Sequence, residues 1–291
     1  MLPLAGILLV FGAVIGGFLM AGGSPALLAQ PAELVIIAGS ALGAMMAANP
    51  ATGLVKTAGA IGRIFRKPVY TTDRYLATLA MLYTVFQFAR RKGPSALEDA
   101  VDNPTRNALF AGYVRTGGNP ETLEFLCDTL RMAALGSVSP YTLDAMLESE
   151  LEVRHKDESG PVETLANLAD SLPGFGIVAA VLGVILAMGA MRDAPLKVGM
   201  KISSALIGTF TGILLAYGIV SPIAARLEKI EHAEAAFFGS LRAGLASFAK
   251  GMPPAVAVEC ARRAIPPDVR PDFDATERAC KRAERPVVPI A

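Results

Sequence analysis

The side chains best suited to handling an ion are hydroxyls and carboxyls in or beside long apolar runs. One apolar run carries six hydroxyls, on Ser203, Ser204, Thr209, Thr211, Tyr217 and Ser221. Helical hydroxyls commonly donate to a carbonyl of the preceding turn, which gives each of them a plain structural explanation. The alternative is that some line a water-accessible groove whose carboxylate comes from another chain.

Two carboxylates border the apolar runs. Glu33 precedes the second run and Asp170 precedes the third, and we expect both at the membrane interface rather than at the midplane. Ion pathways usually need an ionisable side chain within the membrane. Because none of the four runs described below contains Asp, Glu, Lys, Arg or His, the chain alone is predicted not to conduct protons.

The cysteines and histidines argue against metal and nucleophilic chemistry. Cys127, Cys260 and Cys280 form no CxxC pair, and His155 and His232 lie far apart in sequence. This spacing favours neither a zinc site nor a Ser-His-Asp triad. We therefore expect no catalytic residue, metal or cofactor. The net charge of +1 gives no field that would attract nucleic acid.

The composition places much of the chain in lipid. Of 291 residues, 53% are hydrophobic and 18% are charged, against about 25% charged in soluble domains. A spanning helix needs about 20 apolar residues. Four runs meet this requirement: Leu2–Ala21, Leu34–Ala48 (extendable to about Val55), Leu172–Met191 and Ile202–Ala225.

Lysine and arginine predict the orientation of these spans. The chain has 27 lysine and arginine residues. Residues 53–170 contain 13 of them and residues 223–291 contain 11, whereas the link 22–33 has none. Positive residues stay in the cytoplasm, so both long polar stretches and both termini are predicted there. The fold class is an all-α membrane protein with four transmembrane helices and a large helical cytoplasmic insert between the second and third. The predicted divisions are 1–52, 53–170, 171–225 and 226–291, the last helical and then disordered over about its final ten residues.

Small residues recur every fourth position in all four spans, which lets helices approach closely in lipid. The repeats are Gly12 and Gly16; Gly39, Gly43 and Ala47; Gly176, Ala180, Gly183 and Ala187; and Gly208, Gly212 and Ala216.

The polar stretches carry helix signals. Thr72 is the expected cap of a helix that buries Tyr75, Leu79, Leu82 and Phe86 and ends before Gly93-Pro94. Ser95 and Glu98 have the spacing of a capping box. Asn119-Pro120 and Ser139-Pro140 predict two further helix starts, with ends near Leu135 and Lys156. A separate helix is expected after Pro161, and the fourth span is expected to continue to about Lys250.

Four segments together resemble the MotA family of flagellar motor stator subunits, within the MotA/TolQ/ExbB proton channel superfamily. They are residues 31–39 (PAELVIIAG), 170–181 (DSLPGFGIVAAV), 208–222 (GTFTGILLAYGIVSP) and 253–259 (PPAVAVE). The resemblance covers nearly the whole chain. It implies a bacterial inner-membrane protein that is not an enzyme, in a ring of five around two copies of MotB. MotB supplies the protonatable Asp and the peptidoglycan anchor, and the ring drives the rotor protein FliG.

The resemblance also implies roles for individual residues. Arg90, Glu98 and Glu150 match charged rotor-contact positions, and Pro173 and Pro222 match prolines that couple ion passage to movement. Four of these residues also have a plain structural explanation. Arg90 is a cation at a helix end and Glu98 belongs to a helix cap. Pro173 is tolerated in the early turn of a helix, and Pro222 ends or kinks one. The implied ion pathway is lined by Thr209, Ala180 and Tyr217. Sodium-driven relatives carry Thr near Ala180, so the methyl group here favours protons.

Three other classes of membrane protein are alternatives to this family. An energiser of the TolQ or ExbB type has three spans and an external N-terminus, which does not fit four runs. A membrane enzyme needs a polar constellation at the membrane face, and the sequence has no such motif. A transporter acting alone is expected to show broken helices and intramembrane charge, and neither is evident.

Overall fold

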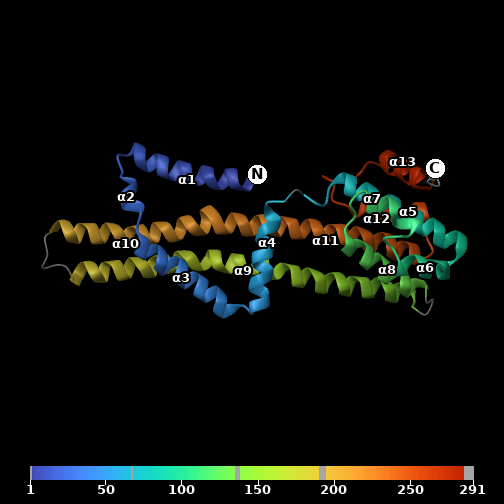
Figure 1. Ribbon diagram of the computed structural model, residues 1–291, viewed down its shortest axis with the longest axis horizontal. Helices are drawn as coiled ribbons and strands as arrows, with labels where there is room; N and C mark the ends of the chain where they lie inside the picture. Colours follow the sequence, from blue (N-terminus) through green and yellow to red (C-terminus); the bar gives the residue numbers. More distant parts are fainter. Residues whose placement is uncertain (1, 67, 135–137, 190–194, 285–291) are drawn as a thin grey trace. The chain divides into compact units, whose positions relative to one another are not determined.

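The computed structural model describes residues 2–66, 68–134, 138–189 and 195–284, and the regular secondary structure within them is helical. The chain divides into two compact units. We call residues 1–67 and 157–230 the membrane unit, and residues 68–156 and 231–291 the extramembrane unit. Because α9 (Pro140–Gly189) and α11 (Ser221–Ala249) contribute residues to both, each unit is assembled from separate stretches of sequence (Figure 1).

Among its described residues, the membrane unit holds four stretches long and apolar enough to cross a membrane, which confirms the four predicted spans. They lie in α1 (Leu2–Met20), in α2 (Pro25–Leu28) with α3 (Pro31–Ala48), in the second half of α9, and in α10 (Pro195–Leu215) with its continuation. A π-helical turn, η2 (Ala216–Val220), joins α10 directly to α11. The continuation of the fourth span as one helix past residue 226 is confirmed.

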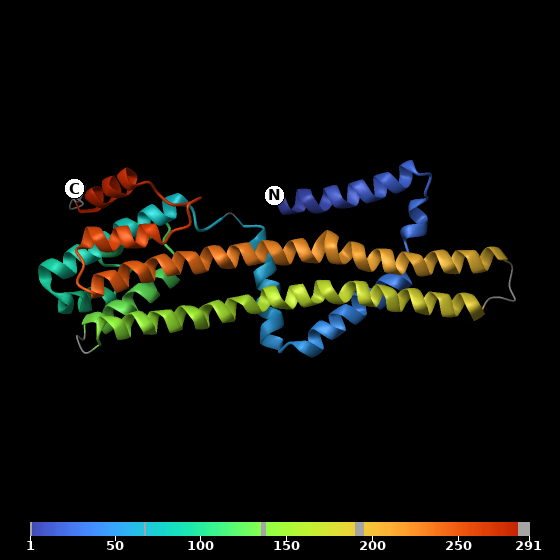
Figure 2. The same cartoon turned by 180° about the vertical axis from the view of Figure 1, so that it is seen from behind.

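The third and fourth spans pack along a seam of small residues. A Cβ atom added at Gly212 would lie 2.7 Å from the carbonyl oxygen of Leu172, and one added at Gly183 would lie 2.7 Å from the Ala205 methyl carbon. Only glycine permits this approach, as expected for helices packed in lipid. Figures 1 and 2 show α9 and α10 side by side from opposite directions.

The predicted small-residue contacts are therefore confirmed within the chain for these two spans. The repeated glycines of the first two spans make no such close contact. A Cβ added at any of them would meet no described atom within 4 Å; they are Gly12, Gly16, Gly39 and Gly43.

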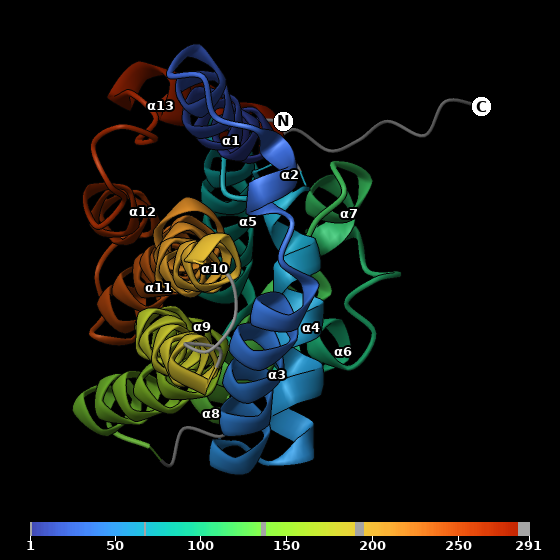
Figure 3. The same cartoon turned by 90° about the vertical axis from the view of Figure 1, so that its left-hand side faces the viewer.

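The second span ends at Ala48, so its extension to Val55 is wrong. Pro50 disfavours helical backbone at the preceding residue, and Asn49 is extended at φ −126° and ψ 142°. A new helix, α4 (Ala51–Ile64), then begins in a different direction (Figure 3).

Apolar and polar contacts hold α4 within the membrane unit. Ala60 and Ile64 are buried in one cluster with Leu165 of α9 and Leu227 of α11. Asn49 lies between α3 and α4, and its Oδ1 accepts a hydrogen bond of 3.0 Å from the Thr164 hydroxyl of α9. The amphipathic character of α4 thus positions it across the long helices rather than as an extension of α3.

The extramembrane unit is built around α5 (Thr72–Lys92). Its buried face includes Tyr75, Leu79, Leu82 and Phe86, as the spacing predicts. The short η1 (Pro94–Leu97) and α6 (Glu98–Asp102) follow. Other elements are α7 (Ala108–Arg115), α8 (Pro120–Ala134), α12 (Pro254–Arg263), α13 (Phe273–Glu284), the first half of α9 and the second half of α11. The rings of Phe86 and Phe248 stack with centroids 4.3 Å apart.

The helix starts are mostly where the sequence predicts them. Asn119 Oδ1 accepts from the Glu121 amide and Ser139 Oγ accepts from the Thr142 amide, so both predicted caps are confirmed. The cap of α5 is Thr71, whose hydroxyl accepts from the Arg74 amide, one residue before the prediction.

A further predicted helix end, near Lys156, is wrong. No break separates Lys156 from the third span, because α9 runs through Pro161 and Pro173 for 50 residues. A proline inside a helix removes one backbone hydrogen bond, and the burial of Leu165 and Leu172 in the packed membrane unit offsets that loss. In the tail, α13 extends to Glu284; residues 285–291, where disorder was predicted, lie outside the described residues.

Candidate functional site

A carboxylate is buried in the membrane unit. Glu33 lies in the first turn of α3 and is 7% exposed. The hydroxyl of Ser204 on α10 lies 3.3 Å from Glu33 Oε1 and 3.1 Å from Gln30 Oε1, so its single hydrogen is available to either acceptor. Pro31 sets the start of α3, where a carboxylate is favoured by the helix dipole. One of the six predicted hydroxyls thus meets a carboxylate, and this carboxylate belongs to the same chain.

The second oxygen of Glu33 points at the seam between α9 and α10. A Cβ added at Gly208 would lie 2.8 Å from Glu33 Oε2, 3.1 Å from the Ala179 methyl carbon and 3.4 Å from the Ala180 amide nitrogen. Oε2 is buried, and no described residue hydrogen-bonds to it. An unsatisfied buried carboxylate oxygen is costly, so Oε2 is an acceptor that a further hydrogen-bond donor would stabilise.

The three predicted pathway residues are only partly brought together. Ala180 flanks Gly208 beside Glu33, and the Thr209 Cα would lie 3.3 Å from a Cβ added at Gly176. Both therefore belong to the α9–α10 seam. Tyr217 lies two turns further along, in the π-turn, and is 65% exposed.

The two predicted coupling prolines have different surroundings. Pro173 lies inside α9 next to Leu172, whose carbonyl faces Gly212 across the seam. Pro222 is exposed and follows the π-turn directly. Because proline has no amide hydrogen, the carbonyl of Gly218, four residues earlier, loses its α-helical partner. The π-turn occupies this position, and single π-turns are frequent at functional sites.

The charged rotor-contact candidates lie on three elements of the extramembrane unit. Arg90 is exposed in the last turn of α5, and Glu98 is exposed as the first residue of α6. The predicted capping box is wrong, since neither η1 nor α6 begins with a side-chain cap. Gly93, at φ 88°, ends α5, and Ser95 already lies within the following turn, where it cannot act as an N-cap.

Glu150 is the third candidate and lies on α9. Partial desolvation, followed by the neighbouring Asp128 carboxylate, raises the pKa of Glu150, while Arg154 opposes that rise. Glu150 therefore lies in a more crowded electrostatic environment than an isolated surface carboxylate. Its backbone is helical and its side chain is exposed.

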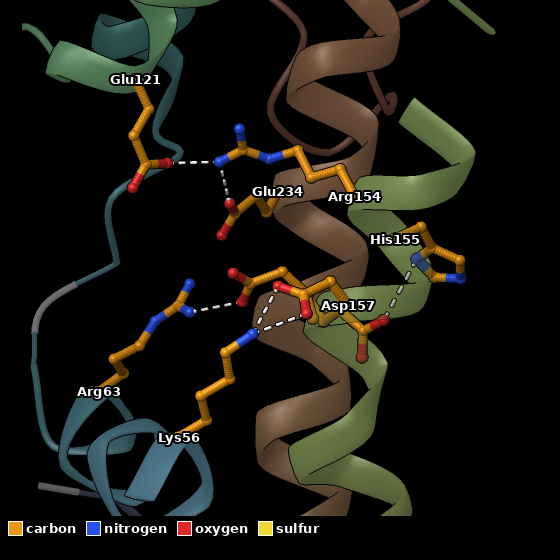
Figure 4. A network of polar contacts seen from close by, with 9 residues as sticks. Lys56, Arg63, Glu121, Arg154, His155, Asp157 and Glu234 are labelled. Atoms are coloured by element: carbon orange, nitrogen blue, oxygen red, sulfur yellow. Dashed lines mark hydrogen bonds and ion pairs between the residues drawn. The ribbon is translucent and has the colours of Figure 1, made fainter. Parts of the chain in front are cut away.

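Arg154 connects three helices of the extramembrane unit (Figure 4). Its guanidinium contacts Glu121 of α8 and donates to Glu234 Oε1 of α11 at 2.9 Å, and it lies 4.0 Å from the Phe238 ring centroid. Glu234 is only 5% exposed. On the adjacent residue, His155 Nδ1 lies 3.2 Å from Glu231 Oε1, also on α11. A buried charge is tolerated when paired and hydrogen-bonded, so this cluster fixes the packing of α8, α9 and α11.

A second set of ion pairs belongs to the membrane unit. Lys56 Nζ of α4 lies 2.6 Å from Asp157 Oδ1 of α9 (Figure 4). Arg63, also on α4, donates to Glu158 Oε2 of α9 at 2.8 Å. These partners are a third or more exposed. Exposed pairs add little stability, but two of them two turns apart on α4 favour one register of α4 on α9.

In the described part of the chain, no group of three His, Cys, Asp or Glu residues is arranged to hold a metal ion. Burial raises the pKa of Cys127 to about 11 and that of Cys280 to about 12. Both thiols therefore stay protonated at neutral pH and are poor metal ligands.

Comparisons with known proteins cover nearly the whole chain. The family model for the motility protein A N-terminal region matches residues 4–93, and that for the MotA/TolQ/ExbB proton channel family matches residues 120–238. Motility protein A of Escherichia coli is 37% identical over 286 residues, which is 98% of this chain and 97% of that protein. The chain belongs to the motility protein A family.

Further relatives agree. Chemotaxis protein LafT of Vibrio parahaemolyticus is 30% identical over 94% of this chain and 96% of its own length. The flagellar MotAB stator complex from Bacillus subtilis matches with a TM-score of 0.70 at 25% identity, over 88% of this chain and 92% of that one. The structure of C. jejuni MotAB shares the fold, with a TM-score of 0.75 at 20% identity. The match covers 93% of this chain and 98% of that one. The chain is thus a multi-pass inner-membrane stator subunit of the proton channel family.

Sequence reasoning missed two features of this site. One is the contact of Glu33 and Gln30 with Ser204 and Gly208, which come from separate parts of the chain; the predicted interface position of Glu33 stays a prediction. The π-turn was also missed. Its signal is Pro222 inside a helix that continues on both sides, with a glycine four residues before it.

Proposed function

We propose that this chain assembles with MotB into a proton-conducting complex that converts ion flow into torque on the rotor protein FliG. The observation that carries the proposal is the match to motility protein A over nearly the full length of both chains. The matched solved structures are complexes named MotAB, which supports MotB as the partner. The proposed assembly is a homo-oligomeric ring, a pentamer, with the N- and C-termini in the cytoplasm.

The proposed ion route runs along the α9–α10 seam. It includes Thr209, Ala180 and Tyr217, and we add Glu33 because its buried Oε2 faces that seam. Protons are the proposed ion, since Ala180 offers a methyl group where a hydroxyl would serve as a sodium ligand. The carboxylate that completes the route comes from MotB, so the ring without MotB does not conduct.

The proposed output is a contact between the extramembrane unit and the rotor. Arg90, Glu98 and Glu150 are exposed and charged, and exposed charge pairs steer association while adding little binding energy. Such contacts suit a step that is made and broken repeatedly. Pro173 and Pro222 are the proposed hinges between ion passage and this movement, and the π-turn before Pro222 supports a flexible joint there.

Deletion of the gene tests the proposal. Cells without it are expected to keep their flagella and lose swimming, and the intact chain is expected to restore it. In the same cells Glu33→Gln is expected to slow swimming severalfold. The matched control is Glu228→Gln, because Glu228 is an exposed glutamate of the same unit and should swim as the unaltered chain does.

Ion dependence adds a second readout. Swimming is expected to persist without sodium and to stop when a protonophore collapses the proton gradient. Unaltered swimming of the deletion strain, when no other stator gene is present, would refute the stator role. Sodium-dependent swimming would refute the choice of proton alone.

A further inference from the structure

Arg226 marks one end of the fourth span. Residues 202–225 contain no Asp, Glu, Lys, Arg or His. In a helix they cover about 36 Å, against about 30 Å for the hydrocarbon core of a bilayer. Lys201 and Arg226, which border this stretch, therefore lie in the headgroup layers on opposite faces of the membrane.

The helix α4 lies at the same level as Arg226. Two residues separate the start of α4 from the end of the second span, so α4 begins at the membrane surface. Its buried Ile64 belongs to one apolar cluster with Ala224 and Leu227 of α11. These two residues flank Arg226. Figures 1 and 2 show α4 crossing the two long helices, so it runs along the headgroup layer rather than away from it.

The side of α4 turned away from this cluster is apolar and exposed. Val55 is 73% exposed, and the exposed Gly59 and Gly62 follow it four and seven positions later, on the same side of the helix. Phe65, which ends α4, is 47% exposed. Apolar surface at this level is stable against the acyl chains of the headgroup boundary and unstable in water.

Two cations beside this surface have no anionic partner among the described residues. Arg66 is exposed, and Arg226 is partly buried, with its Nε fully buried and without a hydrogen bond. Neither guanidinium pairs with a described carboxylate, although Glu163 and Glu228 are exposed in the same unit. Lys56 and Arg63, by contrast, are already paired with α9.

A buried cationic donor without a partner is costly. In a bilayer the group that is always present at the level of Arg226 is the phosphate of a phospholipid. A guanidinium can donate two parallel hydrogen bonds to a phosphate, which makes this pairing strong and specific. The unsatisfied donor, its level in the membrane and the neighbouring apolar surface thus indicate one class of ligand.

We propose that Arg226 and Arg66 bind the phosphate groups of anionic phospholipids, whose acyl chains cover the outward side of α4 at Val55 and Phe65. One basic residue at an anionic bilayer surface strengthens binding about fivefold. The inference requires a membrane location and is independent of the stator role. It gives the chain a preference for anionic over zwitterionic lipid at this face of the membrane.

Charge variants test the proposal in the complete complex with MotB, reconstituted in phosphatidylcholine mixed with phosphatidylglycerol. Lipid retained after detergent washing is counted by mass spectrometry. The unaltered complex is expected to retain phosphatidylglycerol preferentially, and Arg226→Gln to retain about fivefold less. Arg226→Lys is expected to keep most of it. Arg278→Gln is the matched control, since Arg278 is an exposed arginine of α13 in the extramembrane unit.

Thermal unfolding separates lipid binding from a packing role of Arg226. Phosphatidylglycerol is expected to raise the melting temperature of the unaltered complex above its value in phosphatidylcholine. This difference is expected to shrink for Arg226→Gln and to stay for Arg278→Gln. If Arg226→Gln assembles no complex, Arg66→Gln takes its place, because Arg66 is exposed and its replacement disturbs no packing.

A second pair of variants tests the apolar side of α4. Val55→Glu places a carboxylate against the anionic surface and is expected to lower retained phosphatidylglycerol about fivefold. The matched control is Val153→Glu, because Val153 is 68% exposed on α9 in the extramembrane unit. It is expected to retain as much as the unaltered complex.

Three results would overturn the proposal. One is equal retention of the two lipids by the unaltered complex, and another is unchanged retention by the arginine variants. The third is a Val55→Glu variant that breaks the ring while lipid retention stays unchanged, which would assign the outward side of α4 to a second copy of the chain. None of these results touches the stator role, which fails only if the intact chain does not restore swimming.

Discussion

The two units of this protein achieve close packing by opposite means. In the membrane unit, α9 and α10 meet through glycine and alanine, so that backbone approaches backbone at Gly176, Gly183 and Gly212. In the extramembrane unit, large aromatic and aliphatic side chains fill the interior, with Phe237 and Phe238 fully buried. Lipid offers no hydrophobic gain for burying one more apolar side chain, whereas water does.

The same contrast governs polar groups. The membrane unit buries Glu33 with one oxygen unsatisfied by any described residue, beside a glycine. The extramembrane unit buries Glu234 against the guanidinium of Arg154, which also contacts Glu121. Buried side-chain atoms without a hydrogen-bond partner among the described residues occur in both units, since Arg154 Nε is another. The contrast therefore lies in the carboxylates, of which Glu234 has a cationic partner and Glu33 has the Ser204 hydroxyl.

The largest expected effect is in the aromatic core of the extramembrane unit. Phe237 contacts the rings of Tyr70, Tyr75 and Phe238. Phe237→Ala is expected to lower the free energy of unfolding by about 3–5 kcal/mol, because it removes buried area and leaves a cavity. Thermal unfolding of the solubilised protein measures it. Phe273→Ala is the control, since Phe273 is 58% exposed, and an equal loss there would contradict the expectation.

A smaller effect is expected at the glycine seam. A Cβ at Gly212 would lie 2.7 Å from a backbone carbonyl, which cannot move aside as a flexible side chain can. Gly212→Ala is therefore expected to cost about 1–3 kcal/mol of stability, seen as a lower melting temperature. Gly239→Ala is the matched control in α11, where the added methyl group meets open space and alanine favours the helix. A stable Gly212→Ala variant would show that the seam tolerates separation.

The smallest effect concerns pH. Hydrogen bonds from Arg262 and then Arg263 lower the pKa of Glu259 from 4.5 to about 2 in the folded protein, against its desolvation. The stabilisation is thus fully present above the unfolded pKa and is lost as pH falls from about 4.5 towards 2. Glu259→Gln is expected to flatten the decline of melting temperature with pH over that range.

The control for this pH effect is Glu277→Gln. Glu277 pairs with Lys281 on the surface of α13, and both partners are half exposed or more. An equally flattened profile for Glu277→Gln would mean that the effect does not come from the Arg262–Glu259 contact.

Local signals in the sequence predicted much of this fold. The caps at Asn119 and Ser139, the buried face of α5 and the four spans were all predicted, since each depends on residues a few positions apart. The predicted ends of α3 and of the helix near Lys156 were wrong. The two prolines act differently: Pro50 breaks a helix at an exposed turn, while Pro161 is accommodated in a packed one.

The candidate site was less predictable. Arg90, Glu98 and Glu150 were identified by resemblance, and their exposure agrees with a contact role without testing it. The contacts of Glu33 could not be predicted, because nothing in residues 31–39 reveals that Ser204 and Gly208 lie opposite.

The amino-acid sequence alone predicts that this protein is helical, spans the membrane four times and carries small residues at recurring positions in its spans. These properties follow from hydropathy and from hydrogen bonds between residues three or four positions apart. Packing between distant segments sets which carboxylate is buried and which proline lies inside a continuous helix. Burial depends on what packs from distant parts of the chain, and no local pattern contains that information.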